Sequence, residues 1–324
     1  MGLTNDTKVF VEREKYLEII GFTSYAYITG KITKYSGMAG GRTRTLGEFI
    51  ENFIYGKIAE EAFKLFLINK FGLQTLTEVD IADFYRGVYL PDVVAIKKGN
   101  DFIPLKFWID VKEVRRDQKW MLIPASSVRT RPYDAYVAVW VGLPDEHIIW
   151  IVKNVPGVKE KMSKDWLKKV NEVARNIEVI PCKILGFVTW RDASAVEKMK
   201  NIELNKKGGC YFDGKTPLFD PENPFQKRGR VGENIGFALK ILEQNSDWNE
   251  LVSLIKINKK IIPEIPMPKT KSGRLSKKSG LPDNFITFSD YREAFQAFFE
   301  EQLNEIRKKF GKINRSESWF AQPL

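Results

Sequence analysis

The chain has 324 residues, of which 43% are hydrophobic and 29% charged, so a folded protein of one large or two ordinary domains is expected. Its single histidine and two cysteines exclude zinc fingers and histidine-based metal clusters, which leaves carboxylates and carbonyls as ligands for a hard cation such as Mg²⁺. The net charge of +11 favours a polyanionic partner. No apolar run reaches the ~18 residues of a membrane span and the first residues lack the apolar core of a signal peptide, so a cytoplasmic protein is expected.

The first 45 residues are expected to combine a short helix, a strand and a loop. Residues 8–20 have helical spacing, and residues 23–33 favour a strand. A glycine-rich basic loop at residues 36–44 contains Arg42 and Arg44. Because this loop lacks the pattern of a nucleotide-binding phosphate loop, we interpret it either as a plain mobile loop or as a segment whose arginines contact a phosphate backbone.

A long amphipathic helix is predicted next. Thr45 and Glu48 have the spacing of a capping box, in which both side chains accept hydrogen bonds from free amides at the helix start. Apolar residues then recur with helical spacing to about Lys70, and Gly72 is expected to end the helix.

Strands dominate the stretch after this helix. The predicted strands are bounded by turn residues and cover residues 87–96, 102–114, 136–141, 147–152 and 184–190. The second strand is expected to return along the first through a tight turn, and the fourth to pair with the third. A helix at residues 163–176 precedes the last strand, so the order is helix, three strands, helix, strand, with one added hairpin.

The rest of the chain is predicted to be a basic, mostly helical accessory region. It covers residues 196–324 and follows a first region, residues 1–195, that contains the predicted strands. The accessory region need not fold independently of this first region. Helices are expected at residues 233–245, at residues 248–257, and from residue 289 or 290 to about residue 310. Residues 256–280 are interpreted as an exposed basic arm or a solvated loop.

Three charged residues in the strand region can carry chemistry. Asp110 and Lys112 lie two apart in a predicted strand, so their side chains share a face, and the predicted hairpin brings Asp92 alongside them. Ions in such apolar surroundings need pairing or a metal. Mg²⁺ held by the two carboxylates would polarise a phosphodiester and activate water, while the lysine would orient the water and balance negative charge. A buried Asp–Lys pair with a purely structural role is the alternative.

The sequence Leu-Pro-Asp-Val-Val-Ala at residues 90–95, followed by Trp-Ile-Asp-Val-Lys at residues 108–112, resembles the PD-(D/E)XK nuclease superfamily. The resemblance covers residues 45–190 and extends to the order of the predicted elements. It implies an α/β fold with a restriction-endonuclease-like core of order α-β-β-β-α-β, in which helices flank a mixed central sheet. A mostly helical C-terminal elaboration would follow this core.

Many members of this superfamily carry a glutamate on the first helix that contributes to the metal site. Glu60 is favoured for that role, because Phe63 and Leu67 place its helix face toward the interior. Glu61 is the alternative, and either side chain could instead be a surface charge.

Within the superfamily the chain is most similar to type II restriction endonucleases, as a stand-alone basic protein with additions on both sides of the core. The resemblance implies Mg²⁺-dependent hydrolysis of double-stranded DNA to 5′-phosphate and 3′-hydroxyl ends. Asp92 and Asp110 would hold one or two metal ions, with Lys112 and Glu60 as further catalytic residues. A homodimer and a cognate DNA methyltransferase are the implied partners. The rival functions are a structure-selective junction or repair nuclease with the same site, and a basic DNA-binding protein without activity.

Polar and basic residues beside the predicted core are candidates for DNA contacts. Surface solvation is the alternative for all of them. The candidates are Arg42, Arg44, Arg115, Arg116, Gln118, Lys119, Arg129 and Arg131.

Overall fold

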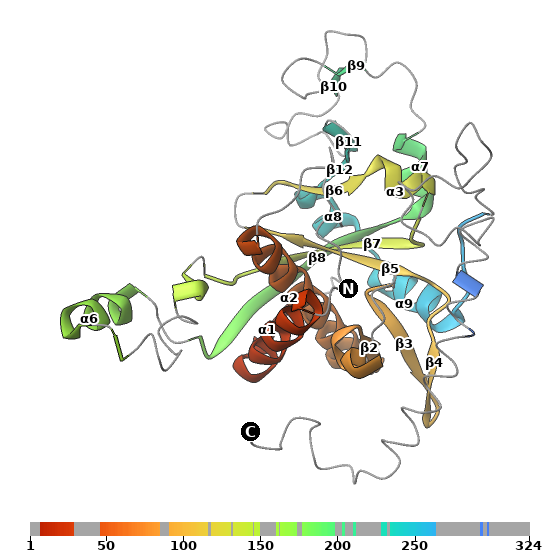
Figure 1. Ribbon diagram of the computed structural model, residues 1–324. Coiled ribbons are helices and arrows are strands. Elements are labelled where there is room, and N and C mark those ends of the chain that lie inside the picture. The colour runs from red at the N-terminus through yellow and green to blue at the C-terminus, as the bar shows by residue number, and fades with distance from the viewer. Residues whose placement is uncertain are drawn as a thin grey trace, which may run out of the picture.

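The protein is a mixed α/β structure built around a mixed sheet with helices on both sides (Figure 1). The description rests on a computed structural model. The residues that it describes are 7–28, 46–84, 91–115, 118–130, 132–144, 146–149, 160–161, 163–173, 177–197, 203–204, 210–211, 228–231, 234–263, 292–293 and 297. None of the helices in these ranges is long and apolar enough to cross a membrane.

The central sheet has four strands in the order β1 (Lys8–Glu12), β8 (Val179–Thr189), β7 (Ala135–Val141) and β5 (Ile109–Val114). Strands β5 and β7 are parallel, and the other neighbours are antiparallel. Six of the seven residues of β7 are buried, which explains its nearly continuous apolar sequence. The predicted third and last strands of the core are thereby confirmed as β7 and β8.

The two faces of this sheet belong to two apolar cores. Val137 and Val139 of β7 share one core with α1 (Arg13–Ile28) and α2 (Leu46–Phe71). Tyr136 points to the other face, as alternation along a strand requires. That second core is formed with α3 (Ala125–Thr130), α7 (Trp190–Glu197) and α8 (Leu239–Asn245). Figure 1 shows α1 and α2 on one side of the sheet and α3, α7 and α8 on the other.

A smaller antiparallel sheet carries the predicted hairpin. It contains β2 (Thr75–Thr77), β3 (Val93–Lys98) and β4 (Asp101–Pro104), and Gly99 adopts a positive φ of 62° in the tight turn between β3 and β4. The 3₁₀ helix η1 (Val79–Phe84) follows β2.

The returning strand predicted at residues 102–114 is wrong as a single strand, because β4 and β5 belong to different sheets. Pro104 has no N–H to extend the ladder, and the N–H of Trp108 donates to a carboxylate oxygen of Asp134 at 2.8 Å. The chain therefore leaves the hairpin sheet before it enters the central sheet.

Four further predictions are wrong in whole or in part for related reasons. Residues 8–12 form β1 rather than a helix, because alternate residues of this segment are buried when it pairs with β8, and residues 23–28 continue α1 instead of forming a strand. Residues 147–149 are helical and do not pair with β7. Residues 234–238 form β12, which pairs with β6 (Trp120–Pro124), instead of the first half of a helix.

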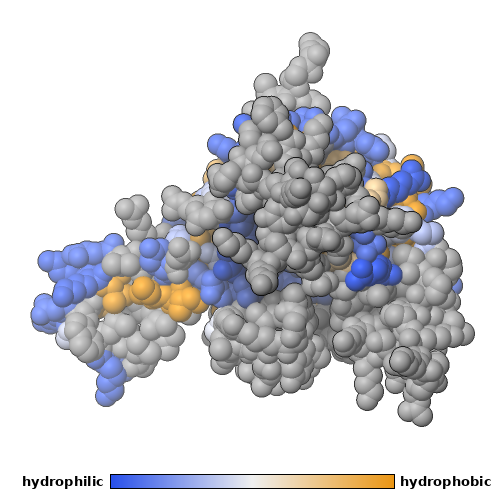
Figure 2. Space-filling view, turned by 90° about the horizontal axis from the view of Figure 1, so that it is seen from above, coloured by the Kyte–Doolittle hydropathy of each residue, from blue (hydrophilic) through white to orange (hydrophobic). Residues whose placement is uncertain are grey.

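Helices were placed more accurately. Helix α2 confirms the long helix predicted from residue 45, α6 (Lys164–Val173) lies within the predicted residues 163–176, and α9 (Trp248–Ile257) matches its predicted bounds. Helix α6 projects from the body in Figure 1, and its end of the molecule shows hydrophilic residues beside a hydrophobic patch in Figure 2. The remaining described strands are β9 (Glu203–Leu204), β10 (Cys210–Tyr211) and β11 (Arg228–Val231).

The last predicted helix and the basic arm fall mostly outside the described residues. Residues 292, 293 and 297 are helical, and residues 264–280 are not described. The described part of the accessory region packs on the central α/β core, since Leu251, Val252 and Ile255 of α9 are buried in the same apolar core as α2.

Candidate functional site

The two halves of the motif meet where β3 begins and β5 runs past it. The N–H of Asp92 donates to the carbonyl of Ile109 at 3.1 Å, and the N–H of Val111 donates to Oδ2 of Asp92 at 2.6 Å. The first bond joins the residue before β3 to β5, and the second joins β5 to the Asp92 carboxylate. They hold the Asp92 side chain against the strand that carries Asp110 and Lys112.

Asp110 and Lys112 lie on one face of β5, as their spacing requires. Nζ of Lys112 is 2.7 Å from Oδ2 of Asp110. Asp110 is buried, while Asp92 and Lys112 are only partly buried, so the group remains open to solvent on one side. Asp110 pairs in register with Tyr136 on the neighbouring strand β7, so the two side chains lie on the same face of the sheet.

Burial and repulsion by a neighbouring carboxylate dominate the electrostatics of Asp92. Burial and the nearby charge of Asp110 raise the pKa of Asp92 to about 7, against the opposing effect of Lys57. Burial alone would lower the pKa of Lys112, but Asp110 and Asp92 outweigh it, so this pKa lies above its ordinary value. Lys112 is therefore an ammonium at neutral pH, next to two carboxylates that repel each other.

Helix α2 contributes a second group of charged side chains, which influence Asp92 electrostatically. Glu60 is buried, and both of its carboxylate oxygens accept hydrogen bonds from Nζ of Lys57, at 2.6 and 2.8 Å. The same ammonium donates to Oε2 of Glu78 at 2.5 Å. Phe63 and Leu67 are fully buried on this side of the helix, which confirms that it faces the interior.

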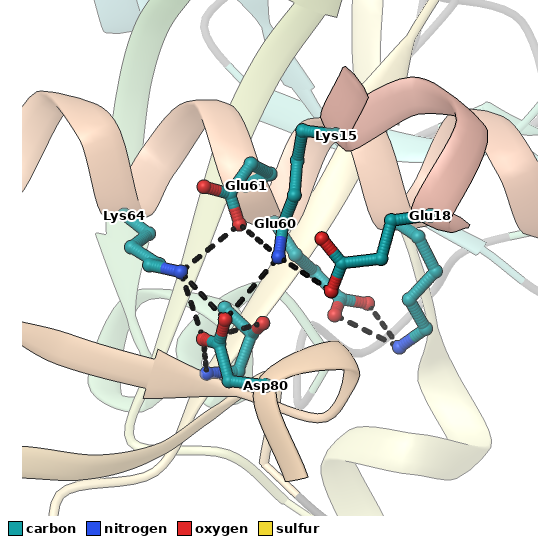
Figure 3. Close-up of polar contacts among 8 residues, drawn as sticks. Lys15, Glu18, Glu60, Glu61, Lys64 and Asp80 are labelled. Carbon is teal, nitrogen blue, oxygen red and sulfur yellow. Dashed lines mark hydrogen bonds and ion pairs between the residues drawn. The ribbon is translucent and has the colours of Figure 1, made fainter. Parts of the chain in front are cut away.

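Glu61 belongs to a separate network of ion pairs. Its carboxylate lies 3.2 Å from Nζ of Lys64 and 3.7 Å from Nζ of Lys15, and both lysines also pair with Asp80 (Figure 3). This network ties α1 and α2 to η1. Of the two glutamates, Glu60 is the one that senses Asp92: burial and the charge of Asp92 raise the pKa of Glu60 well above its ordinary value, against the opposing effect of Lys57.

The donor set suits a hard divalent cation. Mg²⁺ prefers oxygen ligands, and is often held by only one or two carboxylates together with water and substrate phosphate. Asp92 and Asp110 supply two such carboxylates at a solvent-accessible edge. Within the described ranges, no three Asp, Glu, His or Cys side chains form a group that could hold a metal by themselves.

Four of the candidate DNA-contacting residues are described. Arg115 pairs with Glu51 at 3.1 Å and stacks on Tyr55 of α2, with its guanidinium carbon 4.5 Å from the ring centre. Gln118 and Lys119 are exposed just after β5. Arg129 pairs with Glu197 across α3 and α7, at 2.6 Å. The remaining candidates lie outside the described residues; they are Arg42, Arg44, Arg116 and Arg131.

Sequence reasoning missed two residues next to Asp92. Lys57 precedes Glu60 by three residues on α2, a spacing that favours an ion pair on a helix and could have drawn attention to it. Glu78 has no local signal, because its approach to Lys57 depends on how the turn after β2 packs against α2.

A second missed feature lies where β5 begins. The carboxylate of Asp134 accepts hydrogen bonds from the N–H groups of Trp108, Ile261 and Ile262, at 2.6 to 3.1 Å. It also pairs with the buried guanidinium of Arg292, at 2.7 Å. Asp134 therefore joins residues from the C-terminal region to the start of the strand that carries Asp110.

Comparison with models of protein families, with curated proteins and with solved structures finds no match for this chain. The motif and the geometry around Asp92 are therefore the grounds on which a function can be argued. Of the predicted fold, the structure shows a mixed sheet flanked by helices.

Proposed function

We propose that the protein is a Mg²⁺-dependent deoxyribonuclease of the PD-(D/E)XK type, acting as a type II restriction endonuclease. The observation that carries this proposal is the juxtaposition of Asp92 with Asp110 and Lys112 across two hydrogen-bonded backbone segments. A short motif of this kind occurs often by chance in sequences. The proposal is supported by the position of these three charged residues at one partly exposed edge.

The chemistry assigned to each residue follows from its charge and position. Mg²⁺ held by Asp92 and Asp110 would supply polarisation of the phosphodiester and a lowered pKa for bound water. Lys112 keeps its proton at Nζ and is placed to orient the attacking water and balance the charge that develops on the phosphate. Glu60, on the inward face of α2, would assist the site through the metal or its water.

The restriction function adds finer expectations to this proposal. Hydrolysis would leave 5′-phosphate and 3′-hydroxyl ends on double-stranded DNA, and a homodimer would match the symmetry of a palindromic target. A cognate DNA methyltransferase would protect the host genome. The net charge of +11 supports a polyanionic substrate.

Cleavage of a mixed duplex substrate tests the proposal. The purified chain would be incubated with genomic DNA and plasmid in Mg²⁺, in Ca²⁺ and in EDTA, and the fragment ends would be sequenced. Ends that share one short sequence in Mg²⁺ alone support a restriction enzyme. Preferred cutting of a four-way junction over linear duplex would instead indicate a structure-selective nuclease. Binding without cutting in any metal would indicate a protein that only binds DNA.

A further inference from the structure

Strand β1 is an edge of the central sheet, and among the described residues it pairs only with β8. Backbone hydrogen bonds at the two ends of β1 join residues 7 and 13 to β8. Because successive residues of an antiparallel strand direct their N–H and C=O groups to opposite sides, residues 9 and 11 face β8 as well. Lys8, Phe10 and Glu12 therefore direct their backbone groups toward the open edge.

The side chains of the same three residues are exposed, and the middle one is a large aromatic group. Phe10 is 54% exposed, whereas Val9 and Val11 on the other face of the strand are buried in the core. The register places Phe10 opposite Pro181 of β8, which is exposed as well, so the apolar surface extends across both strands. An edge strand with an exposed apolar centre is a surface on which another strand can pair.

The sequence of β1, Lys-Val-Phe-Val-Glu, is complementary in charge to a second copy of itself. In an antiparallel pairing centred on Phe10, Lys8 of each copy lies opposite Glu12 of the other, and the two phenylalanines lie opposite each other. The same register joins the residues whose backbone groups face the open edge, so side chains and backbone favour one arrangement. A parallel pairing in register would place like charges side by side, which is destabilising.

We propose that β1 is the interface of a homodimer, in which two copies of the chain pair through this edge about a two-fold axis. The two four-stranded sheets then form one continuous sheet. The other edge strand, β5, is already bonded to Asp92, so the assembly closes at two copies. The inference rests on the proposed function only for the expectation of a homodimer, because the interface itself follows from β1.

The size of this contact sets the stability expected of the dimer. Three residues on each strand provide about six backbone hydrogen bonds, together with one aromatic contact and two ion pairs. A contact of this size is at the low end of specific interfaces, so a dissociation constant on the order of micromolar is expected without DNA. By symmetry, one charge reversal replaces both ion pairs with repulsion and should weaken the dimer by at least about tenfold.

Charge reversal at the two ends of β1 tests the interface without DNA or metal. Analytical ultracentrifugation of the full chain at concentrations of about 1 to 100 µM should show a dimer, and Lys8→Glu or Glu12→Lys should each dissociate at least about tenfold more readily. An equimolar mixture of these two variants restores opposite charges at both positions and should recover the dimer. The control Lys98→Glu makes the same charge change at an exposed position of β3 and should leave the dimer unchanged.

The outcomes separate this inference from the proposed function. Recovery of the dimer only in the mixture supports the interface and shows that both variants are folded. A monomeric unaltered chain over this concentration range would overturn the interface and leave the proposed metal site unaffected. A dimer that is equally stable in both single variants would place the interface on another surface and would also overturn it. A chain that forms this dimer but cleaves no DNA would contradict the proposed function and not the interface.

Discussion

Oδ2 of Asp92 accepts a hydrogen bond from the backbone N–H of Val111 at 2.6 Å, so the first aspartate of the motif is fixed to the strand that carries the second. This bond makes the separation of the two carboxylates a property of the backbone. Burial and the nearby charge of Asp110 raise the pKa of Asp92 to about 7, although the hydrogen bond from Val111 and the charge of Lys57 act in the opposite direction.

Substitutions of Asp92 and Lys112 should have different effects on metal binding and cleavage. Asp92→Asn removes a proposed metal ligand and should weaken Mn²⁺ binding together with cleavage. Lys112→Ala should reduce cleavage by at least about 100-fold while Mn²⁺ still binds, because its role is to orient water and balance charge. Titration with Mn²⁺ and a cleavage assay on the same preparations check this, and equal loss of metal binding in both variants would contradict the assigned roles.

DNA affinity should decrease steeply as salt increases. Lysine and arginine contacts release counterions from the phosphate backbone, and each lost contact lowers the salt dependence by about one unit in a double-logarithmic plot. In Lys119→Ala and Arg129→Ala, the slope of affinity against salt concentration is expected to be smaller by about one unit each. Fluorescence anisotropy with a labelled duplex at several salt concentrations measures it, and an affinity that does not depend on salt would argue for a small-molecule substrate.

The apolar face predicted at the C-terminal end is one candidate dimer interface. Its residues, which lie outside the described part of the chain, are Tyr291, Ala294, Phe295, Phe298, Phe299, Leu303, Ile306 and Phe310. We expect two protomers of 37.4 kDa on one duplex, measured by light scattering of the DNA complex. One protomer per duplex would contradict the dimer. A dimer that persists in Phe298→Glu would exclude this face as its interface.

Asp134 should be among the most important residues for stability. Asp134→Ala leaves Arg292 as an unpaired buried charge and removes the acceptor of three backbone N–H groups. A loss of about 3–5 kcal/mol in the free energy of unfolding is expected, measured by urea denaturation. Arg13→Ala breaks the exposed pair with Glu178 and should cost less than about 1 kcal/mol. Equal losses in the two variants would contradict the structural role of Asp134.

Cys182 should be unreactive in the folded protein. Its side chain is buried, and burial raises the pKa of its thiol to about 12. At pH 8 the thiolate fraction should be about one in 10⁴, and access to reagents is blocked as well. In a Cys210→Ser variant, a thiol reagent should therefore react only after denaturant is added; rapid reaction with the native variant would contradict this burial.

Local sequence patterns correctly predicted those helices and strands whose conformation does not depend on a partner far away in the chain. The helical spacing after Thr45 was sufficient for α2, and the continuous apolar sequence at residues 136–141 was sufficient for β7. Strand β1 could not be predicted in this way, because its partner β8 lies more than 160 residues away and only that pairing makes an extended conformation favourable.

The same distinction holds for the candidate site. The spacing of Asp110 and Lys112 fixed their common face in advance; Asp92 does lie beside their strand, although that strand belongs to the central sheet and not to the predicted hairpin. The approach of Glu78 to Lys57 depends on the packing of α2 against the smaller sheet, which no sequence pattern encodes. Asp134 and Arg292 lie 158 residues apart and were missed for the same reason.

The most direct test of the central claim compares the unaltered chain with Asp110→Ala and with Glu113→Gln, a control on the same strand. Each is mixed with plasmid and genomic DNA in Mg²⁺, and cleavage is followed by gel electrophoresis beside a binding assay. The account predicts cleavage by the unaltered chain and by Glu113→Gln, and a loss of at least about 100-fold in Asp110→Ala with DNA binding retained. Full cleavage by Asp110→Ala would contradict the assignment of the site.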